Sequence, residues 1–191
     1  MKRRSVLTLL GSLSLLACSR TPVTFTGIDI TGANYANDFH LRGHDGKDYS
    51  LASFKGKHLL IFFGFTQCPD ICPTALSRAV QIRKLLGDKA EQLQVIFITI
   101  DPERDTPELL AQYMKAFDPS FLGLYGNMKE TQEAAAAFKV FYQKVPSGSS
   151  YTMDHTAISY VFDDKGKIRL ALKHEQTAEQ CAADLRALMT A

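Results

Sequence analysis

The sequence predicts one α/β domain in which a central, partly parallel sheet is flanked by helices. Two observations predict this class. Continuous apolar runs at 59–65 and 95–100 are typical of strands that are buried on both faces of a sheet. Amphipathic segments that carry helix-capping residues alternate with these runs, which favours helices packed on such a sheet. The 191 residues suit one domain preceded by a short leader.

The first half of the domain is expected to form a hairpin followed by a strand–helix–strand unit. Asp45-Gly46 is typical of a tight turn between antiparallel strands, and Gly87 ends the first amphipathic helix. The expected elements are, in chain order, a short strand at 27–30, a hairpin over 39–51, the buried strand at 59–65, a helix over 75–86 and the buried strand at 95–100.

The second half contains helices with clear N-terminal signals. Thr106 is expected to cap a helix whose first residue is Pro107, and Thr177 is expected to cap the last helix. The expected elements are a helix over 107–117, a strand at 122–125, an alanine-rich helix over 129–142, a hairpin made of 157–162 and 167–172, and a final helix that ends near 189.

The first residues resemble the leader of a bacterial lipoprotein. Lys2-Arg3-Arg4 precedes an apolar run at 6–16 that is too short to span a bilayer comfortably. The run ends at Ala17-Cys18, which resembles a lipobox, where the cysteine is acylated and becomes the new N-terminus. An ordinary cleaved signal peptide is the alternative.

This leader divides the chain into three expected parts. Residues 1–17 form a lipoprotein signal peptide, residues 18–36 comprise the lipidated Cys18 and a tether, and residues 37–191 form the folded domain. Acyl chains on Cys18 would hold the domain at a membrane surface. The expected location is the extracytoplasmic side of a membrane, which is the periplasm in a diderm bacterium.

Charge and cysteine content exclude some function classes. The net charge is +2 and the basic residues form no long cluster, which argues against nucleic-acid binding. With Cys18 assigned to the lipid, Cys68, Cys72 and Cys181 remain. An odd number of cysteines outside the cytoplasm argues against a purely structural disulfide framework.

Cys68 and Cys72 lie where α/β folds place their ligands. They follow the buried strand at 59–65, at the start of a helix, and ligands bind at the carboxyl ends of parallel strands. A helix N-terminus favours thiolates, which are soft ligands that prefer Cu(I). His155, on an expected loop before the second hairpin, is the best candidate for an imidazole ligand. Two thiolates and one imidazole make a three-coordinate Cu(I) site, or a Cu(II) site when a fourth ligand joins.

Three segments together resemble the signature of the Sco/SenC family. They are residues 64–76, which contain both cysteines, residues 101–107, and residues 154–156 around His155. They occur in the family's order and spacing, and the similarity covers roughly residues 25–190. Asp164 departs from the family pattern, because members often have proline in that hairpin turn.

The resemblance implies a thioredoxin-like sandwich, with a central mixed sheet flanked by helices and an N-terminal hairpin extension. It implies a copper chaperone that binds copper through Cys68, Cys72 and His155 and delivers it for assembly of the dinuclear copper centre of cytochrome c oxidase. The implied partners are a copper-accepting oxidase subunit and a thiol reductant protein. The lipobox-like leader adds a membrane, reached through lipidated Cys18.

Other functions of the two cysteines stay open at this point. A thiol–disulfide oxidoreductase would use Cys68 and Cys72 as a redox pair, on acceptor cysteines or in oxidative-stress defence. Such enzymes usually have two residues between the cysteines, whereas here there are three. A peroxiredoxin-like peroxidase, a small structural disulfide and a zinc site are further alternatives, although structural zinc normally has four protein ligands.

Several other residues have a less specific interpretation. Asp101, Arg104 and Asp105 fit either a partner-docking loop or the chemistry of a strand exit and helix cap. Met153 is expected to pack in the core or at its rim, with a thioether contact to Cu(I) as the alternative, and Cys181 is expected to be buried and inert. The remaining histidines are expected at the surface: His40, His44, His58 and His174.

Overall fold

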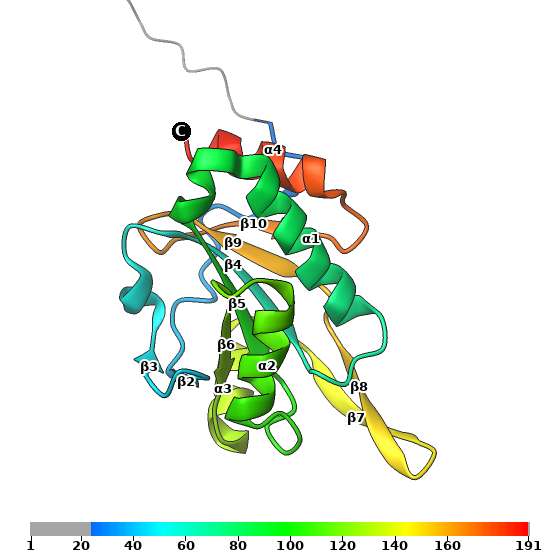
Figure 1. Cartoon of the computed structure of the whole chain (residues 1–191). Coiled ribbons are helices and arrows are strands. Elements are labelled where there is room, and N and C mark those ends of the chain that lie inside the picture. Colours follow the sequence, from blue (N-terminus) through cyan, green and yellow to red (C-terminus); the bar gives the residue numbers. More distant parts are fainter. Residues whose placement is uncertain (1–23, 191) are drawn as a thin grey trace, which may run out of the picture.

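The computed structural model describes residues 24–190 and confirms the predicted α/β class (Figure 1). An eight-stranded mixed sheet has the strand order β1-β10-β9-β4-β5-β6-β2-β3, and β7 and β8 form a separate two-stranded sheet. The strands are β1 (Ile28–Asp29), β2 (Leu41–Gly43), β3 (Asp48–Tyr49), β4 (His58–Gly64), β5 (Leu93–Thr99), β6 (Leu122–Tyr125), β7 (Tyr142–Ser147), β8 (Ser150–His155), β9 (Ser159–Phe162) and β10 (Ile168–Leu172).

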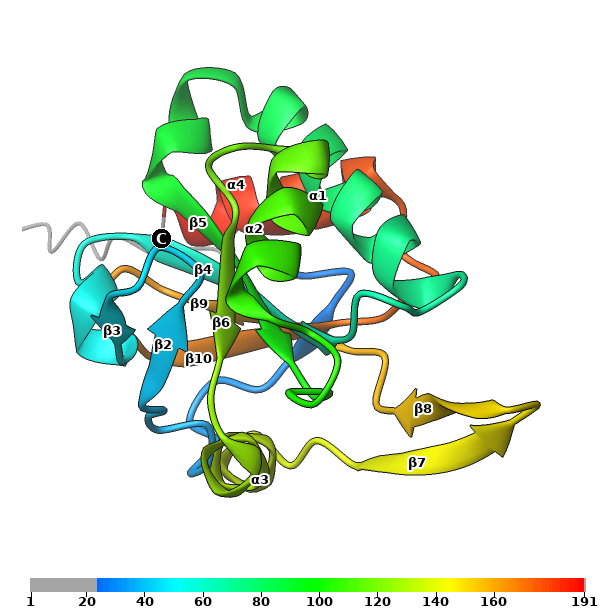
Figure 2. The same cartoon turned by 60° about the horizontal axis from the view of Figure 1, so that its bottom comes forward.

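Helices cover both faces of the large sheet. They are α1 (Ile71–Leu86), α2 (Pro107–Phe117), α3 (Met128–Ala137) and α4 (Ala178–Leu188), with short 3₁₀ helices at Leu51–Phe54 and Gly87–Gln92. α1, α2 and α4 lie on one face and α3 lies on the other (Figure 2). In the part of the chain that the structure describes, no helix is long and apolar enough to cross a membrane.

β4 lies in the middle of the sheet and is buried along its whole length. It pairs parallel with β5 and antiparallel with β9. Successive side chains of β4 enter opposite helical layers, which explains its continuous apolar sequence. Phe63 packs against Phe138, just beyond α3, with 5.1 Å between ring centroids. Phe62 packs against Phe97, which in turn contacts Tyr113 of α2.

Helix starts follow local sequence signals closely, with one exception. α2 begins at Pro107 behind the predicted cap Thr106, and α4 begins directly after the predicted cap Thr177. α1 begins at Ile71, four residues before the predicted start at 75. Pro73 is compatible with this earlier start, because amides in the first turn have no partner within the helix.

The prediction of one long helix over 129–142 was wrong at its C-terminal end. α3 ends at Ala137, and Lys139 has a φ of 55°, in the left-handed region that turns the chain out of the helix. The next residues form β7, which pairs with β8 in a hairpin that the sequence did not predict. Most residues of this hairpin are exposed or half-buried, so its sequence lacks the apolar alternation of a half-buried sheet.

The N-terminal part of the described chain belongs to the large sheet. The predicted hairpin consists of β2 and β3, and β2 also pairs with β6 at one edge of the sheet. At the other edge β1 pairs with β10, and the amides of Thr26 and Gly27 donate to the Asp184 carboxylate at 2.8 and 2.7 Å. Part of the expected tether is therefore folded. The expected signal peptide and Cys18 lie outside the described residues.

Candidate metal centre

Three side chains from distant parts of the chain converge at the carboxyl end of β4. Cys68 lies in the loop after β4, Cys72 in the first turn of α1, and His155 at the end of β8. Their ligand atoms all lie within 4.8 Å of one another, and Cys72 Sγ is 3.8 Å from His155 Nε2. Among residues 24–190, no other group of His, Cys, Asp or Glu side chains has such geometry.

Gly64, the last residue of β4, provides the space that the Cys72 sulfur occupies. A Cβ atom at this position would lie 2.8 Å from Cys72 Sγ and 2.8 Å from Cε2 of Phe97. Both separations are shorter than real Cβ contacts, so a larger residue would displace the thiol or the ring. The buried sulfur therefore packs directly on the central strand, and this packing fixes one ligand relative to the sheet.

The two cysteines differ in burial and in protonation. A hydrogen bond from Cys72 lowers the pKa of the Cys68 thiol to about 3, with further hydrogen bonds from backbone amides, and burial opposes this shift. The Cys72 amide is one of these donors, 3.4 Å from Cys68 Sγ. The pKa of Cys72 is raised, because its thiol donates to Cys68 and is fully buried. The metal-free site therefore holds one thiolate and one thiol.

His155 presents Nε2 to the cysteines. Its Nδ1 lies 3.0 Å from the Thr156 carbonyl oxygen, which can only accept a hydrogen bond. Nδ1 therefore carries the proton in this contact, and Nε2 keeps its lone pair for a metal ion. The ring lies edge-on to Phe62 and Phe65. The sequence placed His155 on a loop; it is in fact the last residue of β8, because the unpredicted hairpin reaches this far.

The donor set suits a soft, low-coordinate metal ion. Two sulfurs and one imidazole nitrogen match the preferences of Cu(I), whereas structural zinc normally requires a fourth protein ligand. A pocket of about 200 Å³ opens over the site, and its lining includes Cys68, His155, Met153 and Asp154. Cys68 is half-buried and accessible from this pocket, whereas Cys72 lies beneath it with no exposed surface.

Asp105 holds the chain just before the cysteine loop. Its carboxylate accepts hydrogen bonds from the amide and hydroxyl of Thr66 and from the hydroxyl of Thr99, the last two at 2.6 Å. Burial raises the pKa of Asp105, and these hydrogen bonds oppose that shift. Asp101 is also buried and accepts from Tyr151 Oη at 2.8 Å. Both carboxylates therefore bond to other segments of the domain, whereas Thr106 caps α2, and docking of a partner at this segment stays a prediction.

The remaining sequence candidates do not join the site. Cys181 is fully buried as predicted, and burial raises the pKa of its thiol. Met153 is 5% exposed and packs in the core, although it also lines the pocket over the site. His58 was expected at the surface but is buried at the start of β4. His44 has a structural role, because its Nδ1 accepts from the Gly123 amide at 3.0 Å.

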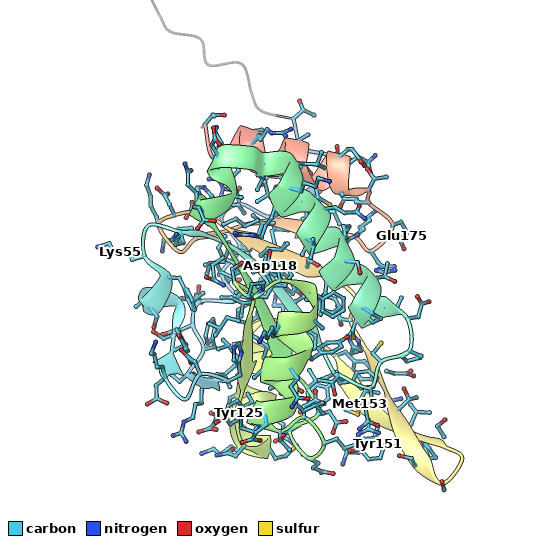
Figure 3. The ribbon with its side chains drawn as sticks, in the orientation of Figure 1. Lys55, Asp118, Tyr125, Tyr151, Met153 and Glu175 are labelled. Carbon is cyan, nitrogen blue, oxygen red and sulfur yellow. The ribbon has the colours of Figure 1, made fainter. Side chains whose placement is uncertain are left out.

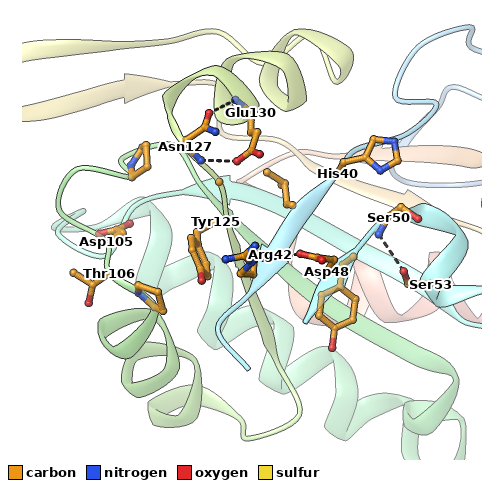
Figure 4. A pocket seen from close by; sticks show the side chains of 15 residues that line it. His40, Arg42, Asp48, Ser50, Ser53, Asp105, Thr106, Tyr125, Asn127 and Glu130 are labelled. Atoms are coloured by element: carbon orange, nitrogen blue, oxygen red, sulfur yellow. Dashed lines mark hydrogen bonds and ion pairs between the residues drawn. The ribbon is translucent and has the colours of Figure 1, made fainter. Parts of the chain in front are cut away.

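A larger cavity of the described domain lies away from the cysteines. It has a volume of about 830 Å³ and is bounded by β2, β3 and the starts of α2 and α3 (Figure 4). The N-termini of both helices are already capped by their own side chains, Thr106 and Asn127. The positive charge of Arg42 in this cavity is neutralised by an ion pair with Asp48, with 3.4 Å between the charged groups. We therefore assign the functional site to the smaller cysteine pocket, where the donor atoms converge.

Comparison with known proteins identifies relatives over nearly the whole domain. The SCO1/SenC family model matches residues 29–190. A SCO2-like protein of Rickettsia conorii is 38% identical over 177 residues, which cover 89% of this chain and 85% of the relative. The human mitochondrial SCO2 homolog is 38% identical over 158 residues, which cover 81% of this chain and 59% of the human protein.

Solved structures of similar sequence share the fold. Bradyrhizobium japonicum ScoI with copper bound is 40% identical, with a TM-score of 0.73 and coverage of 79% of this chain and 97% of that chain. Yeast Sco1 with copper bound is 32% identical, with a TM-score of 0.73 and coverage of 81% and 87%. BsSco, described as having a disulfide switch and as a member of the Sco family of cytochrome c oxidase assembly proteins, is 27% identical, with a TM-score of 0.65 and coverage of 85% and 98%. The predicted thioredoxin-like fold is confirmed, and the chain belongs to the SCO1/SenC family.

Proposed function

We propose that this chain is a copper chaperone that binds one copper ion through Cys68, Cys72 and His155 and delivers it for assembly of the dinuclear copper centre of cytochrome c oxidase. One observation carries the proposal: two sulfurs and an imidazole nitrogen converge within 4.8 Å at the base of a small open pocket. Two relatives of at least 32% identity have copper bound, and BsSco belongs to a family described by cytochrome c oxidase assembly.

The site is built to receive and release an ion. Cys68 is already a thiolate and lies at the pocket, so it makes the first bond to an arriving Cu(I) ion. Cys72 then loses its proton and binds from below, and His155 completes a three-coordinate site. An open coordination position lets a thiolate of the acceptor join before the chaperone's own ligands leave, so the ion is transferred by exchange and is never free.

We further propose that lipidated Cys18 anchors the domain to the extracytoplasmic side of a membrane, the periplasm in a diderm bacterium. The basic start, the short apolar run and Ala17-Cys18 support this anchor. Anchoring donor and membrane-bound acceptor on one surface raises their effective concentration. A Cys18→Ser chain is expected to leave the membrane fraction of cells that express it, and retention there at the native level would contradict the anchor.

An anaerobic Cu(I) titration of the reduced full-length chain against a competing chelator tests the copper site. We expect one tight equivalent. Cys68→Ser and Cys72→Ser should each lower the affinity by more than about 100-fold, since changes outside the ligand set already cost about 10–100-fold. His155→Ala should lower it by about 100-fold. Cys181→Ser is the matched control, because Cys181 is buried in α4 away from the site. No competitive binding by the native chain would remove the chaperone proposal.

Copper binding is expected to release about one proton per ion near pH 8. Cys68 is already ionised, whereas the pKa of Cys72 is raised above its ordinary value of 9.0, so Cys72 must give up its proton. The apparent Cu(I) affinity should therefore rise about tenfold per pH unit between about pH 7.5 and about 8.5, after correction for the chelator. Release of two protons, or an affinity independent of pH, would contradict this assignment.

A thiol–disulfide exchange activity is the second candidate, and the different states of the two cysteines favour it. Cys68 thiolate would attack an acceptor disulfide, break its S–S bond and form a mixed disulfide. Cys72 would lose its proton and attack Cys68 Sγ, which forms the Cys68–Cys72 disulfide and releases the acceptor as a dithiol. Two electrons pass to the acceptor, and a thiol reductant protein restores the pair.

The exchange reaction is testable without copper. In a chelator-treated solution, reduced chain is mixed with an oxidised peptide that carries two cysteines. The Cys72→Ser variant is expected to accumulate the mixed disulfide at Cys68, because its resolving thiol is missing, and mass spectrometry would identify it. If native chain leaves the peptide oxidised and the variant traps nothing, the exchange activity is excluded for that acceptor.

A further inference from the structure

We propose that Arg104 is the positioning residue that holds His155 in place opposite the two cysteines. The copper part of this proposal rests on the proposed function, whereas the structural part does not. Arg104 itself is not a ligand. It lies in the turn between β5 and α2, next to both the cysteine loop and the β7–β8 hairpin.

The ligands come from two parts of the domain, and other residues must hold these parts in place relative to each other. Cys68 and Cys72 are attached to β4 and α1, in the centre of the domain, whereas His155 ends a hairpin that projects from the body (Figure 1). Among the residues that the structure describes, the strands of this hairpin pair only with each other. An isolated two-stranded hairpin is marginally stable in water, so its position depends on contacts with the body of the domain.

Those contacts converge on one short segment. Within residues 24–190, the hairpin's side-chain and backbone hydrogen bonds to the body go to Asp101, Glu103 and Arg104, apart from the Cys72–His155 contact itself. The Lys144–Glu103 ion pair is largely exposed, with side chains 41% and 51% accessible, and such pairs contribute little. Tyr151 makes the other contacts, which are partly buried, and it lies beside Met153 on the hairpin (Figure 3).

Arg104 joins the two ligand-bearing parts through Tyr151. Its Nη1 donates to the Tyr151 carbonyl oxygen at 2.8 Å and to Gln67 Oε1, next to Cys68, at 3.2 Å. Its guanidinium carbon lies 3.7 Å from the centroid of the Tyr151 ring and 5.9 Å from that of Phe65. Arg104 Nε also pairs with Asp101, whose other carboxylate oxygen accepts from Tyr151 Oη.

This arrangement sets the position of His155 through the strand. Tyr151 and His155 are four residues apart in β8, so they are on the same face, about 13 Å apart along an extended strand. Fixing Tyr151 against Arg104 therefore fixes the direction in which β8 approaches Cys72. Phe65 also lies between them, since its ring is 5.9 Å from the guanidinium carbon and packs at 83° on the His155 ring, with 6.1 Å between centroids. Only a planar, forked cation makes these contacts together, which excludes lysine as an equivalent.

The first test uses metal-free protein. Arg104→Ala is expected to speed amide hydrogen exchange across β7 and β8 while exchange in β4 stays native, because the hairpin loses its link to the body. Arg83→Ala is the matched control, since Arg83 is 13% exposed, compared with 16% for Arg104, and bonds the carbonyls of Ala90 and Leu93. It should leave hairpin exchange unchanged. Native hairpin exchange in Arg104→Ala would overturn the proposal.

The second test is a double-mutant cycle of Cu(I) affinity. Arg104→Ala should weaken binding by about tenfold in the native background. It should cause less than about a twofold change in a His155→Ala background, because Arg104 acts through His155. Arg83→Ala should stay within about twofold of native. Equal losses from Arg104→Ala in both backgrounds would overturn the proposal, since they would mean that Arg104 acts on the cysteines or on overall stability.

Two design features keep the outcomes distinguishable. If Arg104→Ala does not fold, Arg104→Lys replaces it, with the same expected faster hairpin exchange and a smaller loss of affinity; native behaviour of the lysine variant would overturn the proposal. If the native chain binds no copper, the proposed function fails, whereas the hydrogen-exchange test still decides whether Arg104 holds the hairpin. If the native chain binds copper but the Arg104 variants show the same hairpin hydrogen exchange as the native chain, the positioning role of Arg104 is overturned and the proposed copper function stands.

Discussion

The antiparallel pairing of β4 with β9 is the constraint on which the site depends. Phe62 lies opposite Ser159, so the end of β4 is beside the start of β9. Cys68 follows the end of β4 by four residues, and His155 precedes the start of β9 by four. The two segments therefore meet although 83 residues separate Cys72 from His155. A two-residue slip of this register would shift the pair by about 7 Å, more than any metal–ligand bond tolerates.

The chemistry of the cysteines follows from their different depths in the same packing. Gly64 lets one sulfur lie directly on the sheet, where it is shielded from solvent, while the loop keeps the other at the pocket. The hydrogen bond to Cys68, together with burial, raises the pKa of the Cys72 thiol, and the same hydrogen bond stabilises the neighbouring thiolate. A thiolate at the pocket beside a buried thiol suits both metal capture and disulfide exchange. The arrangement of the two cysteines therefore favours both candidate functions.

Local signals in the sequence predicted much of the fold. Thr106-Pro107 located the start of α2 to the residue, because a cap and a first-turn proline act within a few positions. The sequence did not predict the end of α3. The chain turns out of the helix at Lys139, which is in the left-handed conformation, and the usual sequence signal for that conformation is glycine. The β7–β8 hairpin was missed because it has no continuous buried face. The residues of the candidate metal centre were identified from the sequence, but Tyr151 and Gln67 were not, since their importance depends on contacts between distant segments.

The anchoring of the N-terminal segment has a practical consequence for choosing fragments of this protein. Asp184 is 3% exposed, and its carboxylate is compensated by the amides of Thr26 and Gly27. A fragment that began at residue 37 would lack β1 and both donors, and would leave a buried carboxyl group without these hydrogen-bond partners. A soluble fragment should therefore retain the chain from about Phe25 onward, although the metal ligands lie far downstream. Thr26, Gly27 and β1 thus belong to the folded domain, although they lie far from the metal ligands in the sequence.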